Sequence, residues 1–177
     1  MDEFTDTEFE TKKQRLVRAL SDGCAPHEHP RAYLIVGQPG AGKTTMANIF
    51  TRAEQEDAIF ISGDDYRKDH PHFKELQEQY GDDAVLHTQK FAGRMTEALI
   101  DALSQQGYHL IIEGTLRTVD VPLKTKKLLE QRGYRVSLNV MLVRPEISYL
   151  STLKRYAMMK AHGGTPRMTP KEHGQER

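Results

Sequence analysis

The sequence has little cysteine, no tryptophan and no surplus of either charge. Cys24 is the single cysteine among 177 residues, which excludes an internal disulfide and a zinc site built from several cysteines. Lysine plus arginine number 25, and aspartate plus glutamate also number 25. A generally basic nucleic-acid-binding protein needs an excess of cations, so this balance argues against nucleic acid as a partner.

The sequence also lacks long apolar runs. Its longest uncharged apolar stretch, residues 138–143, is far shorter than the roughly 20 residues that span a bilayer. The first ten residues, MDEFTDTEFE, are acidic, whereas a signal peptide begins basic and continues apolar. Hydrophobic residues make up 37% of the chain, enough for one core at this length. We therefore expect one soluble, cytoplasmic domain over residues 1–177, with no membrane contact.

Four short apolar runs alternate with helical patterns. The runs hardly alternate with polar residues, as is typical of parallel strands buried on both faces, and they span residues 33–36, 58–61, 110–112 and 138–143. Helices are expected at residues 5–20, 43–52, 83–106, 122–132 and 145–160. Thr7 and Glu10 form the expected capping box of the first helix. A loop is expected at 21–30 and a flexible tail at 162–177. This order predicts an α/β sandwich of three layers, with a central, mainly parallel sheet of four or five strands and helices on both faces.

Residues 37–44, GQPGAGKT, match the phosphate-binding pattern GxxxxGK[ST]. The motif follows an apolar run and precedes a helical pattern, so a P-loop NTPase-type fold is expected and a turn that binds nothing is disfavoured. Lys43 is expected to contact the β- and γ-phosphate oxygens, and the Thr44 hydroxyl to ligate Mg²⁺. The predicted nucleotide-binding residues are Gly37, Gln38, Pro39, Gly40, Ala41, Gly42, Lys43 and Thr44.

The remaining sequence narrows the class of P-loop protein. A regulatory GTPase carries a DxxG motif and an NKxD base-reading motif, and neither occurs in this sequence. A chain this small also fits a motor or a large ATPase poorly. The sequence therefore favours a small-molecule kinase, which transfers the γ-phosphoryl group of ATP to a second substrate.

Carboxylates follow two of the predicted strands. Asp64 and Asp65 come after residues 58–61, and Glu113 follows residues 110–112. Because the carboxyl ends of parallel strands share one edge with the phosphate loop, one of these aspartates can accept the proton of an acceptor hydroxyl. Glu113 can bind substrate or a metal-bound water. The alternative for the aspartates is a cap or turn at a strand end.

Charged residues on the later helices have two interpretations. Arg94 and Glu97 lie one helical turn apart and either face the sheet edge or form a solvated ion pair. Arg155 and Arg167 are either cations near the transferring phosphate or surface charges.

Eight histidines invite a metal interpretation. His27 with His29, and His70 with His72, form i,i+2 pairs beside prolines. Neither pair has cysteine or carboxylate companions at the spacing of structural zinc ligands, so no metal site is expected there.

Taken together, these motifs resemble the zeta toxin family, the kinase half of epsilon/zeta-type toxin–antitoxin pairs. The similarity covers about residues 31–170 and includes GQPGAGKTT at 37–45, GDDYRKDHPHF at 63–73, RMTEALI at 94–100, GYHLIIEGTLRTVDVPLKT at 107–125 and RxxP at 167–170. The family often has aspartate where Ser62 stands, and its members extend beyond the position of Arg177.

This resemblance implies phosphorylation of a UDP-activated amino sugar, usually UDP-N-acetylglucosamine, that depends on ATP and Mg²⁺. A small helical antitoxin is the implied protein partner. By position, the resemblance makes Asp64 the catalytic base and Lys43 a phosphate contact. It further implies that Arg155 and Arg167 surround the transferring phosphate. The UDP-sugar contacts it implies are Glu97, Thr115, Arg117 and Thr125.

Two alternatives stay open at the level of sequence. The acceptor of the phosphoryl group can be a different small hydroxyl metabolite. The chain can also be a catalytically weak protein whose main role is to bind the antitoxin.

Overall fold

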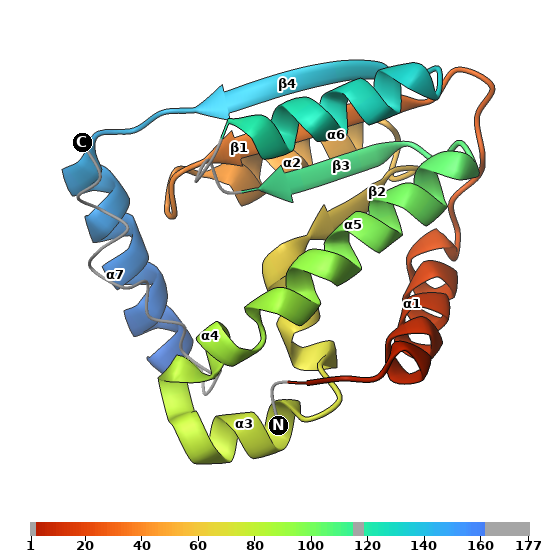
Figure 1. Cartoon of the computed structure of the whole chain (residues 1–177). Helices are drawn as coiled ribbons and strands as arrows, with labels where there is room; N and C mark the ends of the chain where they lie inside the picture. The colour runs from red at the N-terminus through yellow and green to blue at the C-terminus, as the bar shows by residue number, and fades with distance from the viewer. Residues whose placement is uncertain (1–2, 115–118, 162–177) are drawn as a thin grey trace.

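A four-stranded sheet organises the chain, and every strand pairing among the described residues is parallel. The computed structural model describes residues 3–114 and 119–161. The strands are β1 (Arg31–Gly37), β2 (Ile59–Ser62), β3 (Leu110–Gly114) and β4 (Arg135–Met141), in the spatial order β2-β3-β1-β4 (Figure 1). Leu34 of β1 lies opposite both Ile112 of β3 and Leu138 of β4. Because all strands run the same way, their carboxyl ends meet at one edge, as predicted.

Helices cover both faces of this sheet, which confirms the α/β sandwich (Figure 1). The long helices are α1 (Asp6–Ser21), α2 (Lys43–Ala53), α5 (Gln89–Gln105), α6 (Asp120–Gln131) and α7 (Pro145–Ala161). Between β2 and α5 lie four short pieces, η1 (Gly63–Asp69), α3 (Phe73–Tyr80), η2 (Gly81–Asp83) and α4 (Ala84–His87).

Two apolar clusters join the helices to the sheet. On one face, Phe9 of α1, Leu103 of α5 and Leu129 of α6 are fully buried against the strands. On the other face, Ala47 of α2 packs with Ile35 and Ile111. Because the central strands contribute side chains to both clusters, they are apolar at successive positions.

Four local features of the fold differ from what the sequence predicted. The capping box of α1 is formed by Thr5 and Glu8, whose side chains each bond the other's backbone N–H. The helix expected over 83–106 breaks into η2, α4 and α5, and the Thr88 hydroxyl at the break donates to the carbonyl of Ala84 at 3.0 Å. Helix α3 was not foreseen, because its residues are largely polar.

The fourth error concerns β4, which begins before the apolar run and is not buried on both faces. Leu138 is 36% exposed and Val140 is 49% exposed. Among the described residues, no strand pairs with the outer side of β4, so it is an edge strand.

The described part of the chain contains no helix that is both long and apolar enough to cross a membrane.

Candidate functional site

The phosphate loop connects β1 to α2 at the carboxyl edge of the sheet. Gly40 and Gly42 have φ angles of +76° and +86°, a left-handed conformation that glycine adopts without strain. Gly42 is the N-cap of α2, and among the described residues no side chain caps this helix N-terminus. The first backbone N–H groups of α2 therefore suit a phosphate group.

Lys43 is anchored inside the loop. Its ammonium donates to the carbonyl oxygens of Gly37 at 3.0 Å and Gln38 at 2.9 Å. The residue is only 7% exposed. The neighbouring Thr44 is exposed at the start of α2. The loop thus suits a nucleotide phosphate and its Mg²⁺, although the roles of Lys43 and Thr44 stay predictions.

Glu113, at the end of β3, lies beside this lysine. The Lys43 Nζ to Glu113 Oε1 distance is 3.9 Å, and the glutamate side chain is 21% exposed. Burial lowers the pKa of Lys43 against the opposing effect of Glu113, and it raises the pKa of Glu113 against the opposing effect of Lys43. Two partly desolvated opposite charges therefore stand where the phosphate loop meets the end of β3.

Asp64 and Asp65 lie in η1, directly after β2, and both are exposed. In such a helix successive side chains point about 120° apart, so the two carboxylates face different directions. Asp64 interacts electrostatically with both Lys43 and Glu113. Its Oδ1 accepts a hydrogen bond from Nε of Arg67 at 3.0 Å. Asp64 therefore belongs to the same charged cluster as the loop lysine.

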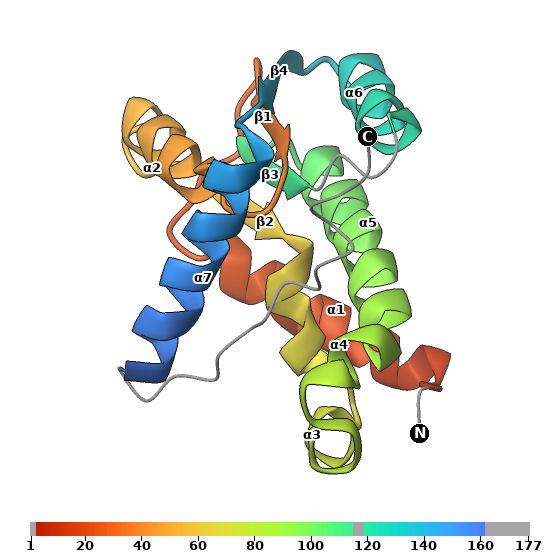
Figure 2. The same ribbon diagram turned by 90° about the vertical axis from the view of Figure 1, so that its left-hand side faces the viewer.

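Helix α7 packs directly on the phosphate loop (Figure 2). Ser148 is 7% exposed, and its hydroxyl donates to the carbonyl of Pro39 at 2.6 Å. A Cβ added at Gly40 would lie 2.7 Å from the Ser148 carbonyl oxygen. Arg155 lies two turns further along α7, is exposed, and interacts electrostatically with Lys43 and Glu113.

Two of the predicted acceptor-site residues lie on helices α5 and α6. Glu97 is exposed on α5, next to Thr96, whose Oγ1 would lie 3.1 Å from a Cβ added at Gly63. Thr125 lies in α6 and donates to the carbonyl of Val121 at 3.1 Å. Their contacts to a substrate stay predictions.

Arg94 contacts helix α1, which differs from the interpretation that placed it at the sheet edge. Its guanidinium bonds Oδ1 of Asp6 at 2.7 Å and lies 4.2 Å from the centre of the Phe9 ring, so it joins α5 to α1. Thr115, Arg117 and Arg167 lie outside the described residues.

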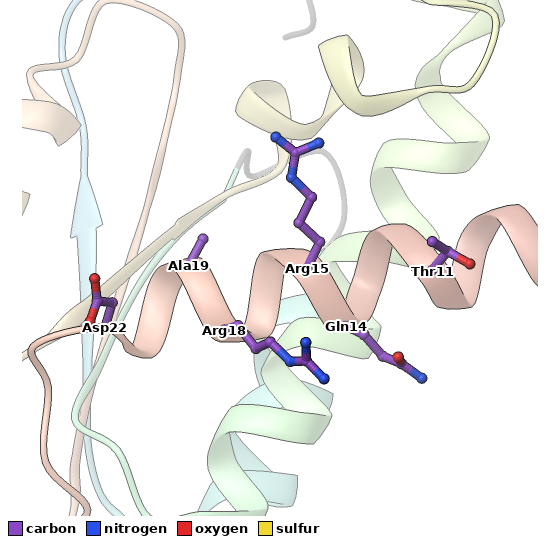
Figure 3. Close-up of a pocket in the computed structure, with 6 residues that line it drawn as sticks. All are labelled: Thr11, Gln14, Arg15, Arg18, Ala19 and Asp22. Carbon is purple, nitrogen blue, oxygen red and sulfur yellow. The ribbon is translucent and has the colours of Figure 1, made fainter.

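Two other features of the described residues lie apart from the charged cluster. The described residues contain no group of three or more His, Cys, Asp or Glu side chains that could hold a metal ion. Figure 3 shows a surface pocket whose lining residues all come from α1 and its end, away from the phosphate loop. These residues are Thr11, Gln14, Arg15, Arg18, Ala19 and Asp22.

Sequence reasoning missed two contacts of the site. Arg67 contacts Asp64, and the i,i+3 spacing between them is a signal visible in the sequence. Ser148 and Thr152 are buried polar residues on one face of α7. Their i,i+4 spacing after Pro145 is common on polar helix faces, so the sequence alone did not identify the contact of Ser148 with the loop.

Comparison with known proteins identifies close relatives. The family model described as Zeta toxin matches residues 15–177. The chain is 47% identical over 172 residues to Toxin PezT of Streptococcus pneumoniae, covering 97% of this chain and 68% of that protein. It is 42% identical over 170 residues to Toxin zeta of Streptococcus pyogenes, covering 96% of this chain and 59% of that toxin. The chain thus spans roughly two thirds or less of the length of these relatives.

Solved structures agree with these relatives. A structure from the PezAT toxin–antitoxin system of S. pneumoniae superposes with a TM-score of 0.87 at 47% identity, covering 91% of this chain and 66% of that one. A putative kinase from Chloroflexus aurantiacus superposes with a TM-score of 0.60 at 17% identity, covering 84% of this chain and 77% of that one. A chain from the complex of AvrRxo1-ORF1 and -ORF2 with ATP superposes with a TM-score of 0.58 at 14% identity, covering 95% of this chain and 51% of that one. These last two share the fold.

Proposed function

The chain belongs to the zeta toxin family, and from this premise we propose that it transfers the γ-phosphoryl group of ATP to a hydroxyl of a UDP-activated amino sugar, UDP-N-acetylglucosamine. In this proposal it acts in the cytoplasm as the toxin of a toxin–antitoxin pair. The observation that carries the proposal is the charged cluster at the sheet edge, where Lys43, Glu113 and Asp64 interact.

The loop side of this cluster accounts for nucleotide binding. The uncapped N-terminus of α2 and the glycines of the loop present backbone N–H groups to the phosphates. Lys43 binds the oxygens of the β- and γ-phosphates, and the Thr44 hydroxyl holds Mg²⁺. When bound, Mg²⁺ neutralises part of the phosphate charge. The binding residues proposed for the loop are Gly37 through Thr44.

The opposite side of the cluster accounts for the acceptor. Asp64 accepts the proton of the attacking hydroxyl and orients that oxygen toward the phosphorus. Arg155, with Arg167, neutralises the charge that develops on the transferring group. Glu97, Glu113, Thr115, Arg117 and Thr125 bind the UDP-sugar in this proposal. Because the transition state of phosphoryl transfer is loose, these groups act mainly by positioning and electrostatics.

A direct assay tests the proposal. The protein is incubated with ATP, Mg²⁺ and UDP-N-acetylglucosamine, and the sugar nucleotide is analysed by mass spectrometry for the mass of one added phosphoryl group. UDP-glucose and simple hydroxyl metabolites serve as competing acceptors in parallel reactions. Phosphorylation of a simple metabolite alone would replace the UDP-sugar with another acceptor, and phosphorylation of none would exclude the kinase function.

The partner is proposed to be a small helical antitoxin. A toxin–antitoxin system is named for one structural relative, the pneumococcal PezAT system. An active kinase arrests bacterial growth when it is expressed alone, and co-expressed antitoxin relieves the arrest. A chain that binds antitoxin but does not arrest growth would favour the binding-protein alternative.

A further inference from the structure

Arg67 makes two hydrogen bonds in different directions from within η1. Its Nε donates to Oδ1 of Asp64 at 3.0 Å, and its Nη1 donates to the carbonyl of Val85 at 2.6 Å. The Arg67 side chain is 18% exposed, whereas that of Asp64 is 61% exposed. A largely buried guanidinium therefore contacts a largely exposed carboxylate.

The second anchor of Arg67 is a well-packed turn. Val85 belongs to α4, and the next helix begins after Thr88, which is fully buried. The Thr88 hydroxyl donates to the carbonyl of Ala84 at 3.0 Å and approaches that of Val85 at 3.4 Å. The carbonyl that accepts from Arg67 is thus part of a turn that side-chain and packing contacts hold in one conformation.

A partner that restrains an exposed aspartate favours catalysis. Side chains adopt several rotamers, and only some of them direct a carboxylate oxygen toward an acceptor hydroxyl. Lys43 and Glu113 interact with Asp64 electrostatically, and Arg67 contacts it within hydrogen-bond distance.

We propose that Arg67 is a positioning residue for phosphoryl transfer, which bridges Asp64 to α4 and fixes the direction of the carboxylate that receives the acceptor proton. The inference rests on the proposed function and adds to it a residue that acts through Asp64. Val85 lies 18 residues after Arg67 in the sequence, so the bond between them also joins the reacting carboxylate to residues 84–88.

The test compares Arg67→Met and Arg67→Lys with a matched control, Arg132→Met. Arg132 also bridges a carboxylate and a backbone carbonyl, through bonds to Asp101, and its side chain is 23% exposed. It lies between α6 and β4, outside the charged cluster. Removal of either arginine costs packing and ion pairing, but of these two arginines it is Arg67 that contacts Asp64.

Two measurements are made on all variants. Hydrogen exchange of backbone amides should accelerate in residues 63–69 and 84–88 for both Arg67 variants and stay unchanged there for Arg132→Met. In the transfer assay, kcat should fall about 10- to 100-fold for Arg67→Met, with KM for ATP within about twofold. Arg67→Lys should recover little of this loss, because one ammonium cannot replace a fork that donates in two directions.

The outcomes separate this inference from the function on which it rests. Unchanged exchange in residues 84–88, or a normal kcat in Arg67→Met beside an active unmodified protein, would overturn the positioning role alone. An equal fall of kcat in Arg132→Met would assign the loss to stability and overturn it as well. Absence of transfer by the unmodified protein would overturn the proposed function, and this inference with it.

Discussion

The hydroxyl of Ser148 donates to the carbonyl of Pro39 across a separation of 109 residues, at 2.6 Å. This bond joins the first turn of α7 to the middle of the phosphate loop, where Gly40 leaves room for the helix backbone. Loop and helix are therefore expected to respond together when a nucleotide binds.

Ser148→Ala should weaken nucleotide binding while the fold is retained. Loss of one neutral hydrogen bond costs about 1 kcal/mol, or roughly fivefold in Kd. Calorimetric titration with ATP measures the effect. Ser148→Thr keeps the hydroxyl and should bind nearly normally. Thr152→Val is the matched control, because that hydroxyl is equally buried but donates within α7, to Tyr149. Equal losses in Ser148→Ala and Thr152→Val would contradict a specific role for the bond to Pro39.

Lys43→Ala should abolish most phosphoryl transfer. The ammonium stands in the loop between two backbone carbonyls and Glu113, and the charge it supplies grows in importance as the γ-phosphoryl group departs. We expect a fall of at least about 100-fold in kcat, with a native circular dichroism spectrum. Near-normal turnover by the folded variant would refute the kinase mechanism.

Asp64→Asn should be far more damaging than Asp65→Asn. The isosteric amide keeps the shape of residue 64 but cannot accept the acceptor proton, so turnover should fall about 10²- to 10⁴-fold. Asp65 interacts with Glu113 and Tyr66, and its replacement should leave turnover nearly unchanged. Parallel rate measurements decide between them. If Asp65→Asn were the less active variant, the assignment of the base would have to move to Asp65.

Mild acid should reduce stability partly through His109. Its ring is stacked on His27 at 3.7 Å, and its Nδ1 accepts the N–H of Arg31 at 3.0 Å. Burial lowers the pKa of His109, and His27 and Arg31 act in the same direction, while Glu54 and Asp57 oppose them. The unfolded chain therefore binds more protons than the folded one just below pH 6.5, so the free energy of unfolding falls as pH decreases through that window.

The variant His109→Asn tests this dependence. Asparagine retains an acceptor near the position of Nδ1 but does not titrate, so the slope between pH 6.5 and the lower folded-state pKa should decrease by at most about 1.4 kcal/mol per pH unit. Urea unfolding at pH 7.5 and pH 5.5 gives the slope. The exposed His29, changed to asparagine, is the control. A slope that is the same in His109→Asn as in the unmodified protein would exclude this contribution.

The sequence identified the sheet and the phosphate loop because both depend on local patterns. Ile35 and Ile111 are buried in one cluster while Leu34 and Ile112 are buried in the other, so the central strands carry a continuous apolar signal. The apolar signal of β4 is weaker, because an edge strand packs on fewer neighbours.

The contacts between distant residues were harder to predict. The bond from Arg67 to Val85 and that from Ser148 to Pro39 depend on how separate elements pack, and neither leaves a periodic trace. The apolar run before Asp64 and Asp65 also does not reveal how the chain continues after β2. The structure has a 3₁₀ helix there, in which successive side chains point in different directions.

The position of β1 at the centre of the sheet also fixes an order of folding during synthesis. Arg31 of β1 pairs with Arg135 of β4, and its other neighbour, β3, begins only at Leu110. A ribosome adding about 5–20 residues per second makes β1 roughly 5–20 s before β4. Such distant pairing slows folding, because a long stretch of chain must close before the contact forms. The phosphate loop is therefore synthesised well before Ser148, and its contact with α7 can form only after that residue has been added.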